Sequence, residues 1–169
     1  MPVDVDALLY LTVWVSLSLF ALAEIARDRT VESWPRAVSA AGLALMIVHI
    51  LIAMGVRHGW QHAAAVAATA QQTNQVYGVE WGWGIYVNYL FVVTWGMAVP
   101  GFRGSGVPGF GVPEVPRFWV RTARVFFLVV IANATIVFAV GWRRVLGVAI
   151  VGVLLYAWRA RTVARRPAL

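Results

Sequence analysis

Residues 37–56 read AVSAAGLALMIVHILIAMGV, an apolar stretch without a charged side chain. A helix of about 20 apolar residues, rising about 1.5 Å per residue, crosses the ~30 Å hydrocarbon core of a bilayer. The stretch follows Pro35-Arg36 and stops at Arg57-His58, so polar or charged residues mark both of its ends. We therefore expect a membrane-spanning helix over residues 37–56.

The composition of the whole chain is that of a membrane protein. Of the 169 residues, 61% are hydrophobic and 12% are charged, whereas soluble domains carry about 25% charged residues. The chain has no cysteine, which excludes disulfides, thiolate metal sites and cysteine nucleophiles. All 14 basic residues are arginines, and they flank apolar runs instead of gathering on one solvated face as in nucleic-acid binders. We therefore expect membrane lipids, and no nucleic acid, among the partners.

Four further apolar runs indicate additional spans. The run 145–158 is the shortest and gives about 21 Å of helix, so the alternative is a four-span protein whose last helix lies in the membrane interface. Both versions are an all-α, polytopic transmembrane helical bundle in which residues 1–169 form a single membrane domain. The other three runs cover residues 7–25, 84–99 and 125–142.

Arginine placement predicts the orientation of the five spans. Positive residues are retained on the cytoplasmic side of a membrane. With five spans, one side carries only Arg57, Arg143 and Arg144. We therefore expect the N-terminus outside and the C-terminus inside, in a bacterial-type cytoplasmic (inner) membrane. The eleven arginines of the other side are Arg27, Arg29, Arg36, Arg103, Arg117, Arg121, Arg124, Arg159, Arg161, Arg165 and Arg166.

Two connections between spans stand out. The inner loop 100–116 holds four prolines and five glycines, which excludes a regular helix there. The outer loop 57–83 contains an Ala-rich segment without proline or glycine, which predicts a short amphipathic helix resting on the outer surface. Aromatic residues around this helix are typical of an interfacial aromatic belt, with an aromatic-lined pocket for a lipid tail, quinone or pigment as the alternative. These residues are Trp60, Tyr77, Trp81, Trp83 and Tyr86.

Polar side chains inside the spans form the first candidate site. Such groups are costly in a membrane and indicate either function or hydrogen bonds between helices. Counted from the outer ends of their spans, His49 lies ~10 Å deep, Asn88 ~6 Å and Asn133 ~12 Å. Thr12 and Ser16 fall at comparable depth. Convergence of these side chains on one interior point would make a ligand-binding layer, and simple interhelical bonding is the alternative.

Arg57, His58 and His62 form a second candidate site above that layer. Two histidines four residues apart share one face of a helix, as in some two-histidine metal sites. Gly59 interrupts the segment, however, and no glutamate follows in the His-Glu-x-x-His manner. The neighbouring arginine favours an anion or lipid headgroup over a metal ion. His58 and His62 therefore remain weak metal candidates, and a solvated helix start is the third interpretation.

The sequence requires no cofactor. A haem held by two histidines needs imidazoles on facing helices at similar depth, and only His49 lies within a predicted span. His49 and His58 are nine residues apart, which turns them to opposite faces of one helix. A haem or chlorin would therefore require a partner chain or a second copy.

No complete catalytic set is present. The serines lack a Gly-x-Ser-x-Gly setting. Glu24, an acidic residue inside a span, lies near its inner end, where Arg27 or Arg36 can pair with it. An enzyme acting on lipid would depend on Glu80 together with the second candidate site.

The sequence thus predicts a small, non-catalytic integral membrane protein. It would act as a structural or accessory subunit of a larger complex or homo-oligomer, or bind a lipid-like ligand at its outer face. The alternative is a haem-, pigment- or metal-binding redox subunit that uses His49, or His58 with His62.

Overall fold

The computed structural model describes residues 4–27, 34–99 and 117–164. The regular structure within these ranges is entirely helical, which confirms the all-α class for this part of the chain. The predicted inner loop 100–116 lies outside the described residues. The helices are α1 (Val5–Ala26), α2 (Trp34–Ile52) with the π-helical turn η1 (Ala53–Arg57), α3 (His62–Tyr77), α4 (Gly84–Ala98), α5 (Arg117–Ala132) with the π-helical turn η2 (Asn133–Val137), and α6 (Arg143–Ala164).

Three described helices are long and apolar enough to cross a membrane. They are Val5–Ala26, Trp34–Arg57, which joins α2 to η1, and Phe118–Val137 in α5 and η2. The helix α4 is apolar but shorter, at 15 residues. The helix α6 has 22 residues and continues through Arg159, because charge ends an apolar run without ending a helix.

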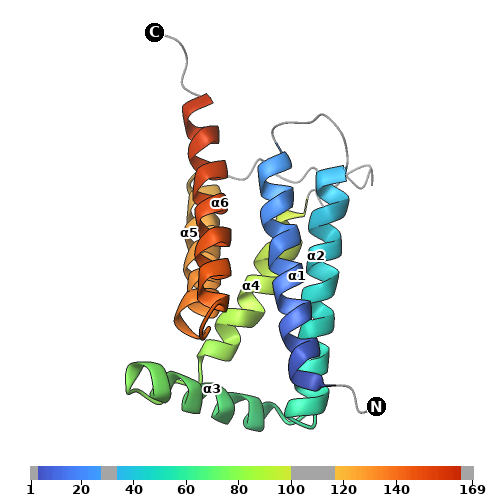
Figure 1. Ribbon diagram of the computed structural model, residues 1–169, viewed down its shortest axis with the longest axis vertical. Helices are drawn as coiled ribbons and strands as arrows, with labels where there is room; N and C mark the ends of the chain where they lie inside the picture. Colours follow the sequence, from blue (N-terminus) through green and yellow to red (C-terminus); the bar gives the residue numbers. More distant parts are fainter. Residues whose placement is uncertain (1–3, 28–33, 100–116, 165–169) are drawn as a thin grey trace.

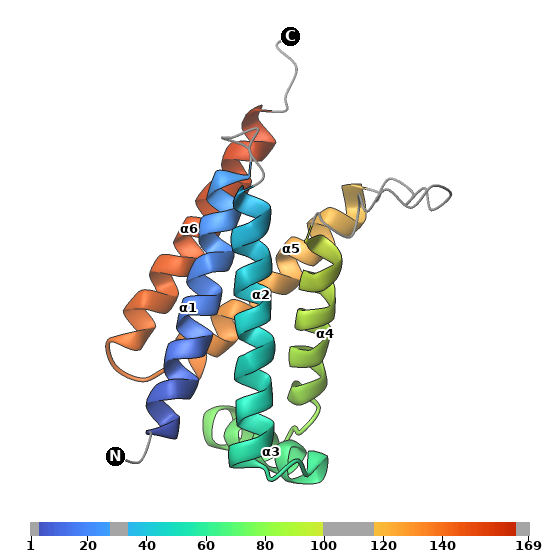
Figure 2. The ribbon, with the colours of Figure 1, turned by 90° about the vertical axis from the view of Figure 1, so that its right-hand side faces the viewer.

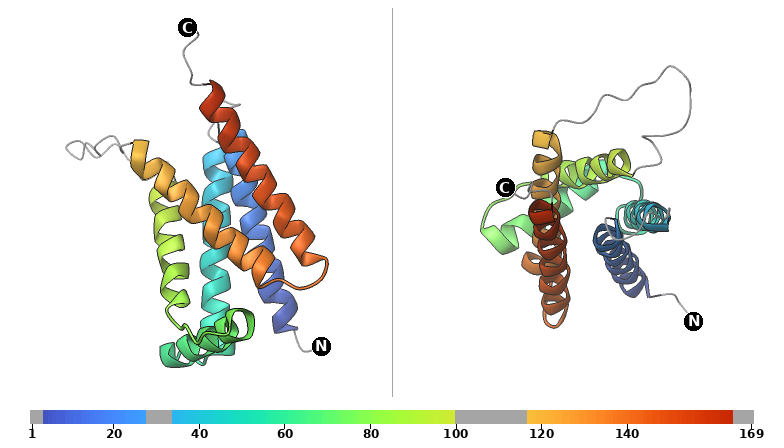
Figure 3. Two further views of the ribbon diagram at one scale, coloured as in Figure 1. Left: turned by 90° about the vertical axis from the view of Figure 1, so that its left-hand side faces the viewer. Right: turned by 90° about the horizontal axis from the view of Figure 1, so that it is seen from above.

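The helices run alternately between two ends of the bundle. The start of α1, the end of η1, the start of α4, the end of η2 and the start of α6 all lie at one end, and α3 lies across that same end (Figures 1 and 2). We call it the α3 end. Seen from above, α1 and α2 form one side of the bundle, α5 and α6 form another, and α4 lies beside α5 (Figure 3).

Small residues allow α1 and α2 to pack closely along their length. The Ser16 hydroxyl donates to the Gly42 carbonyl over 2.7 Å. A Cβ atom at Gly42 would lie only 3.1 Å from the Ser16 carbonyl oxygen. Small residues of this kind let helix backbones approach each other within membranes.

The Asp4 side chain caps the start of α1 by accepting a hydrogen bond from the backbone amide of Asp6 over 3.0 Å.

An aromatic core occupies the half of the bundle away from α3. Trp95 is fully buried, and its ring meets Phe20 of α1 edge to face at 4.8 Å. Phe91 packs in the same way against Phe127 of α5 at 5.2 Å. The indole N–H of Trp95 donates to the Ser39 hydroxyl of α2 over 3.1 Å. One cluster therefore joins α1, α2, α4 and α5.

A buried carboxylate ties α6 to α1. Glu24 is 5% exposed and pairs with Arg27 at 2.9 Å, as the sequence predicted. The indole N–H of Trp158 donates to Glu24 over 2.8 Å. Arg124 of α5 lies 5.8 Å over the Trp158 ring. These contacts join α1, α5 and α6 at the end of the bundle opposite α3.

The helix that corresponds to the predicted span 125–142 begins and ends earlier in the chain, at Arg117 and Val137. Helix α5 begins at Arg117, because the segment before the apolar run continues the same helix with an amphipathic pattern. The helical backbone stops after η2, and Gly141 with φ 65° then turns the chain into α6. A positive φ is readily adopted by glycine, which has no Cβ atom.

The two π-helical turns both lie at the α3 end. After η1 the chain reverses through Gly59 (φ 54°) and Trp60 (φ 62°), and the Trp60 amide donates to the Met54 carbonyl over 2.8 Å. A non-glycine residue with positive φ is uncommon. The Trp60 ring packs over Gly55, where an added Cβ atom would lie 3.1 Å from it. This turn directs the chain from α2 into α3, across the end of the bundle.

Candidate functional site

Helix α3 forms over the Ala-rich segment for which the sequence predicts a helix, and it is fastened at both ends. At its start, His62 contacts Tyr86 of α4 with 3.0 Å between Nε2 and the hydroxyl. At its end, the Tyr77 hydroxyl donates to the Asn133 side chain of η2 over 2.5 Å. Its inward face consists of small residues, including Ala65, which is 2% exposed. Helix α3 therefore covers the space between the longer helices at this end.

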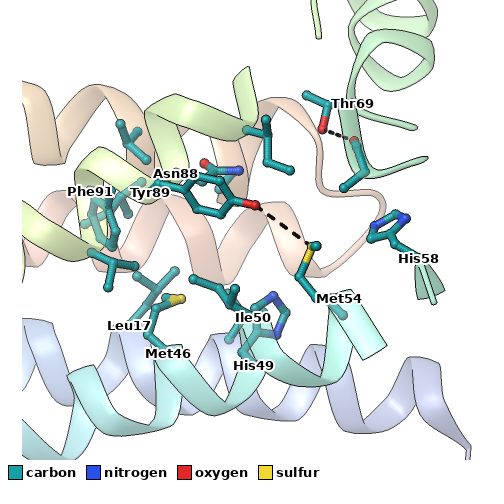
Figure 4. Close-up of a pocket in the computed structure, with 18 residues that line it drawn as sticks. Leu17, Met46, His49, Ile50, Met54, His58, Thr69, Asn88, Tyr89 and Phe91 are labelled. Atoms are coloured by element: carbon teal, nitrogen blue, oxygen red, sulfur yellow. Dashed lines mark hydrogen bonds between the residues drawn. The ribbon is translucent and has the colours of Figure 1, made fainter. Parts of the chain in front are cut away.

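An apolar cavity of about 240 Å³ lies beneath α3 (Figure 4). Apolar side chains of α1, α2, α4 and α5 form most of its wall, and five polar residues reach it from α2, the following turn, α3 and α4. We call it the apolar cavity. Its apolar wall includes Val13, Leu17, Met46, Ile50, Phe91, Val92 and Ile131, and its polar residues are His49, His58, Thr69, Asn88 and Tyr89.

A polar cavity of about 340 Å³ lies beside it. Val13, His49 and Ala134 line both cavities and thus form the partition between them. The wall of the second cavity carries charged and hydrogen-bonding side chains from α1, η1, α3 and the start of α6. We call it the polar cavity. Among these side chains are Asp6, Tyr10, Arg57, Gln72 and Arg143.

His49 is oriented by hydrogen bonds to α1. Its Nδ1 atom lies 3.0 Å from the Leu9 carbonyl oxygen and 3.0 Å from the Thr12 hydroxyl. Thr12 in turn donates to the backbone carbonyls of α1, over 2.9 Å to that of Leu8. Because a carbonyl oxygen can only accept, Nδ1 carries the proton. In the neutral imidazole Nε2 then keeps its lone pair, and no side chain within the described residues hydrogen-bonds to it.

His62 lies between two tyrosines. Besides its contact with Tyr86, its Nδ1 lies 3.4 Å from the Tyr89 hydroxyl. Tyr89 also reaches the Met54 sulfur over 3.9 Å, as Figure 4 shows. A neutral imidazole donates at one nitrogen and accepts at the other, so His62 can serve both tyrosines. This cluster joins the beginning of α3 to α4 and to the wall of the apolar cavity.

The structure brings part of the predicted polar layer together. His49 and Asn88 line the same cavity from α2 and α4. Asn133 does not line either cavity described here, because its side chain accepts the Tyr77 hydroxyl bond instead. Ser16 bonds to the α2 backbone. Interhelical bonding therefore accounts for Ser16 and also involves His49, which in addition shares a cavity with Asn88.

The predicted trio of Arg57, His58 and His62 is distributed over three places. Arg57 faces the polar cavity, His58 lines the apolar cavity and His62 contacts the tyrosines. The turn 58–60 separates the two histidines, so they do not share a helix face. Within the described ranges, no group of three or more histidine or acidic side chains is placed to hold a metal ion.

The predicted aromatic belt residues all lie exposed at or next to α3. Their exposed fractions range from 45% to 68%. Tyr77 and Tyr86 additionally make the bonds that fasten α3. The sequence predicts these residues only as interfacial anchors or as the wall of a pocket. Members of this set are Trp60, Tyr77, Trp81, Trp83 and Tyr86.

The sequence did not predict most residues of the polar cavity, including Asp6, Tyr10 and Arg143. Asp6 and Tyr10 belong to no predicted site, and Arg143 enters the sequence analysis only through the arginine count that predicts the orientation. The order of the helices carried a usable signal, because five alternating helices place the start of the first and the start of the last at one end. Asp6 and Arg143 lie near those two starts.

Comparison with protein-family models, with curated proteins and with solved structures gave no match to this chain.

Proposed function

We propose that this protein is an integral membrane protein with five crossings that binds a lipid-like ligand at its outer face, the α3 end, and has no catalytic activity of its own. The alternating helix directions support this topology, because each of five helices begins at the end where the previous one of the five finished. Arginine placement supports the orientation. Within the described residues, Arg57, Arg143 and Arg144 lie at the α3 end, and the remaining arginines lie toward the other end.

The apolar cavity is the observation that carries the ligand proposal. An apolar cavity of about 150 Å³ admits benzene, so 240 Å³ accommodates a substituted ring or a short acyl segment. His49, Asn88 and Tyr89 offer hydrogen bonds at its edge, a pattern typical of small-molecule sites.

The same geometry argues against nucleophilic catalysis by Thr12 and His49. The Thr12 hydroxyl donates to backbone carbonyls, and the adjacent Nδ1 atom is itself a donor. That imidazole nitrogen cannot act as the base for the hydroxyl. A binding role, alone or as an accessory subunit with a protein partner or a second copy, fits these residues better.

Filling the apolar cavity tests the proposal. Val92 of α4 lines the cavity, whereas its neighbour Val93 points outward and is 56% exposed. Val92→Phe should expel the ligand, and Val93→Phe adds the same atoms on the outer face of the helix. Each protein is purified in a mild detergent, extracted with organic solvent and analysed by mass spectrometry for bound lipid-like molecules.

We expect one molecular species to be enriched with the native chain and with Val93→Phe, and to fall at least tenfold with Val92→Phe. Equal amounts from all three proteins, or no enriched species with the native chain, would exclude a ligand in the apolar cavity. Partner chains in the same preparations are identified from their peptides, which tests the accessory-subunit role separately.

The His49 geometry favours a second candidate, a redox subunit. Histidines that ligate metals commonly donate Nδ1–H to a carbonyl, which leaves Nε2 for the metal. His49 has this arrangement. It would supply one axial ligand to a haem or chlorin, with the second from a partner chain or another copy. An absorption spectrum and elemental analysis of protein from haem-supplied cells test this candidate, which a colourless, metal-free complex would exclude.

A further inference from the structure

We propose that the polar cavity is an anion-binding site, which holds a phosphate or carboxylate group between Arg57 and Arg143. Where the anion is the head of an amphiphile, this inference rests on the proposed function and names the class of its ligand.

Arg143 presents an unused guanidinium edge. Its guanidinium lies 3.7 Å from the centroid of the Tyr10 ring. Stacking on a ring occupies the face of the guanidinium and leaves its in-plane N–H donors available for a carboxylate or phosphate. No carboxylate or other acceptor bonds to this side chain within the described residues. Its neighbour Arg144, by contrast, donates to the Ala139 carbonyl over 2.6 Å.

Arg57 is held by a partner that an anion can replace. Its guanidinium pairs with the Asp6 carboxylate, and both side chains are about half exposed. Ion pairs at this level of exposure contribute little to stability. Two guanidinium groups and a single carboxylate line the cavity, so the described wall keeps an excess positive charge. A second anion balances that charge.

The position of the cavity agrees with an amphiphilic ligand. His49, Val13 and Ala134 separate it from the apolar cavity. An anionic group beside the arginines therefore lies next to the space that accepts an apolar body. A lipid headgroup and a free phosphate share the chemistry that Arg57 and Arg143 recognise, and they differ in whether the apolar cavity is needed.

Titration calorimetry of the full chain in uncharged maltoside micelles tests this site, with empty micelles as the background. The probes are inorganic phosphate and decyl phosphate. Losing a charge-assisted hydrogen bond should weaken binding by about tenfold or more in Arg143→Gln and in Arg57→Gln. Asp6→Asn should tighten binding by about threefold, because it removes the competing carboxylate while keeping the shape of the side chain. Arg144→Gln is the matched control, since it removes the same charge from the next residue.

Saturable binding that requires Arg143, tolerates Arg144→Gln and strengthens in Asp6→Asn supports the site. Should Arg143→Gln fail to fold, the tightening in Asp6→Asn still tests the site.

Phosphate that binds as tightly as decyl phosphate identifies a free-anion site, whereas tighter binding of decyl phosphate identifies a headgroup site. Phosphate binding that survives Val92→Phe supports the anion site even if the apolar cavity holds no ligand. The absence of saturable binding of either probe, or equal losses in Arg143→Gln and Arg144→Gln, would overturn the proposal.

Discussion

Single side chains hold this bundle where two helices approach each other closely. At three such places the contact is made through a small or hydroxyl residue: Ser16 with Gly42, Ser39 with Trp95, and Thr135 with Gly147. The first two are hydrogen bonds, which are worth about 0.6 kcal/mol on average inside membrane bundles. The third is a contact of backbones, and it is the tightest.

Gly147→Ala should destabilise the protein by about 1–3 kcal/mol, the usual effect of overpacking. A Cβ atom at this position would collide with the Thr135 carbonyl oxygen, so α6 and η2 would have to separate. Gly152→Ala is the control, because nothing lies within 4 Å of a Cβ atom there. Thermal unfolding in detergent measures both. Equal melting temperatures for the two variants would show that η2 and α6 do not pack as described.

Some residue contacts could be predicted from the sequence and others could not. The pair of Glu24 and Arg27 lies within one helical turn, so spacing alone places the two together. Trp158, which also binds Glu24, is separated from it by most of the chain. Depth along a span was readable for such residues, but the direction in which each side chain points around its helix was not. For the same reason Asn133 was expected in the ligand layer and instead bonds to Tyr77.

At the scale of elements, the two π-helical turns shape the α3 end. A π-helical turn holds one more residue than an α-helical turn, and such turns occur often at functional sites. The turn η1 carries Arg57 toward the polar cavity, and η2 places Ala134 in the partition between the two cavities. Apolar run length predicted where helices would form, but it contained no signal for either π-helical turn.

Deletion of Ala53 should convert η1 into regular α-helix and turn Arg57 by about 100° around the axis. Arg57 would then lose its contact with Asp6. Because the chain has no cysteine, the pair Asp6→Cys and Arg57→Cys can be joined by a short bis-maleimide. We expect efficient cross-linking in the parent chain and a large loss after the deletion.

The pair Thr12→Cys and His49→Cys controls for this experiment. Both residues precede the deleted position, so their cross-linking should persist. Undiminished linking between positions 6 and 57 in the shortened chain would mean that η1 does not set the direction of Arg57.

At the scale of the whole molecule, the proposed five-crossing topology makes a prediction about accessibility. Ala63 lies at the α3 end and Ala160 near the end of α6, and both are exposed. A membrane-impermeant maleimide added to intact cells should label Ala63→Cys directly, and label Ala160→Cys only after permeabilisation. Labelling of both positions in intact cells would favour the four-crossing alternative with α6 in the interface. Labelling of Ala160→Cys alone would reverse the orientation.

The sequence was sufficient for the helical class and for part of the site. Apolar runs and arginine counts depend only on position along the chain, and the helices near 7–25 and 37–56 were confirmed on that basis. The cavities depend on how five helices pack, which no single run encodes. His49 could be singled out because a histidine is rare in such a run, whereas Tyr10 and Arg143 became interpretable only once α1 and α6 were seen together.

The wall of the polar cavity includes side chains from both ends of the described chain, which affects when the site can form during biosynthesis. A ribosome makes α1, with Asp6 and Tyr10, long before it makes α6, with Arg143. Until α6 has been inserted beside α1, the cation–π stack does not exist and Glu24 has no indole to bind. The anion site is therefore complete only when α6 lies beside α1, and a nascent chain arrested before α6 lacks it.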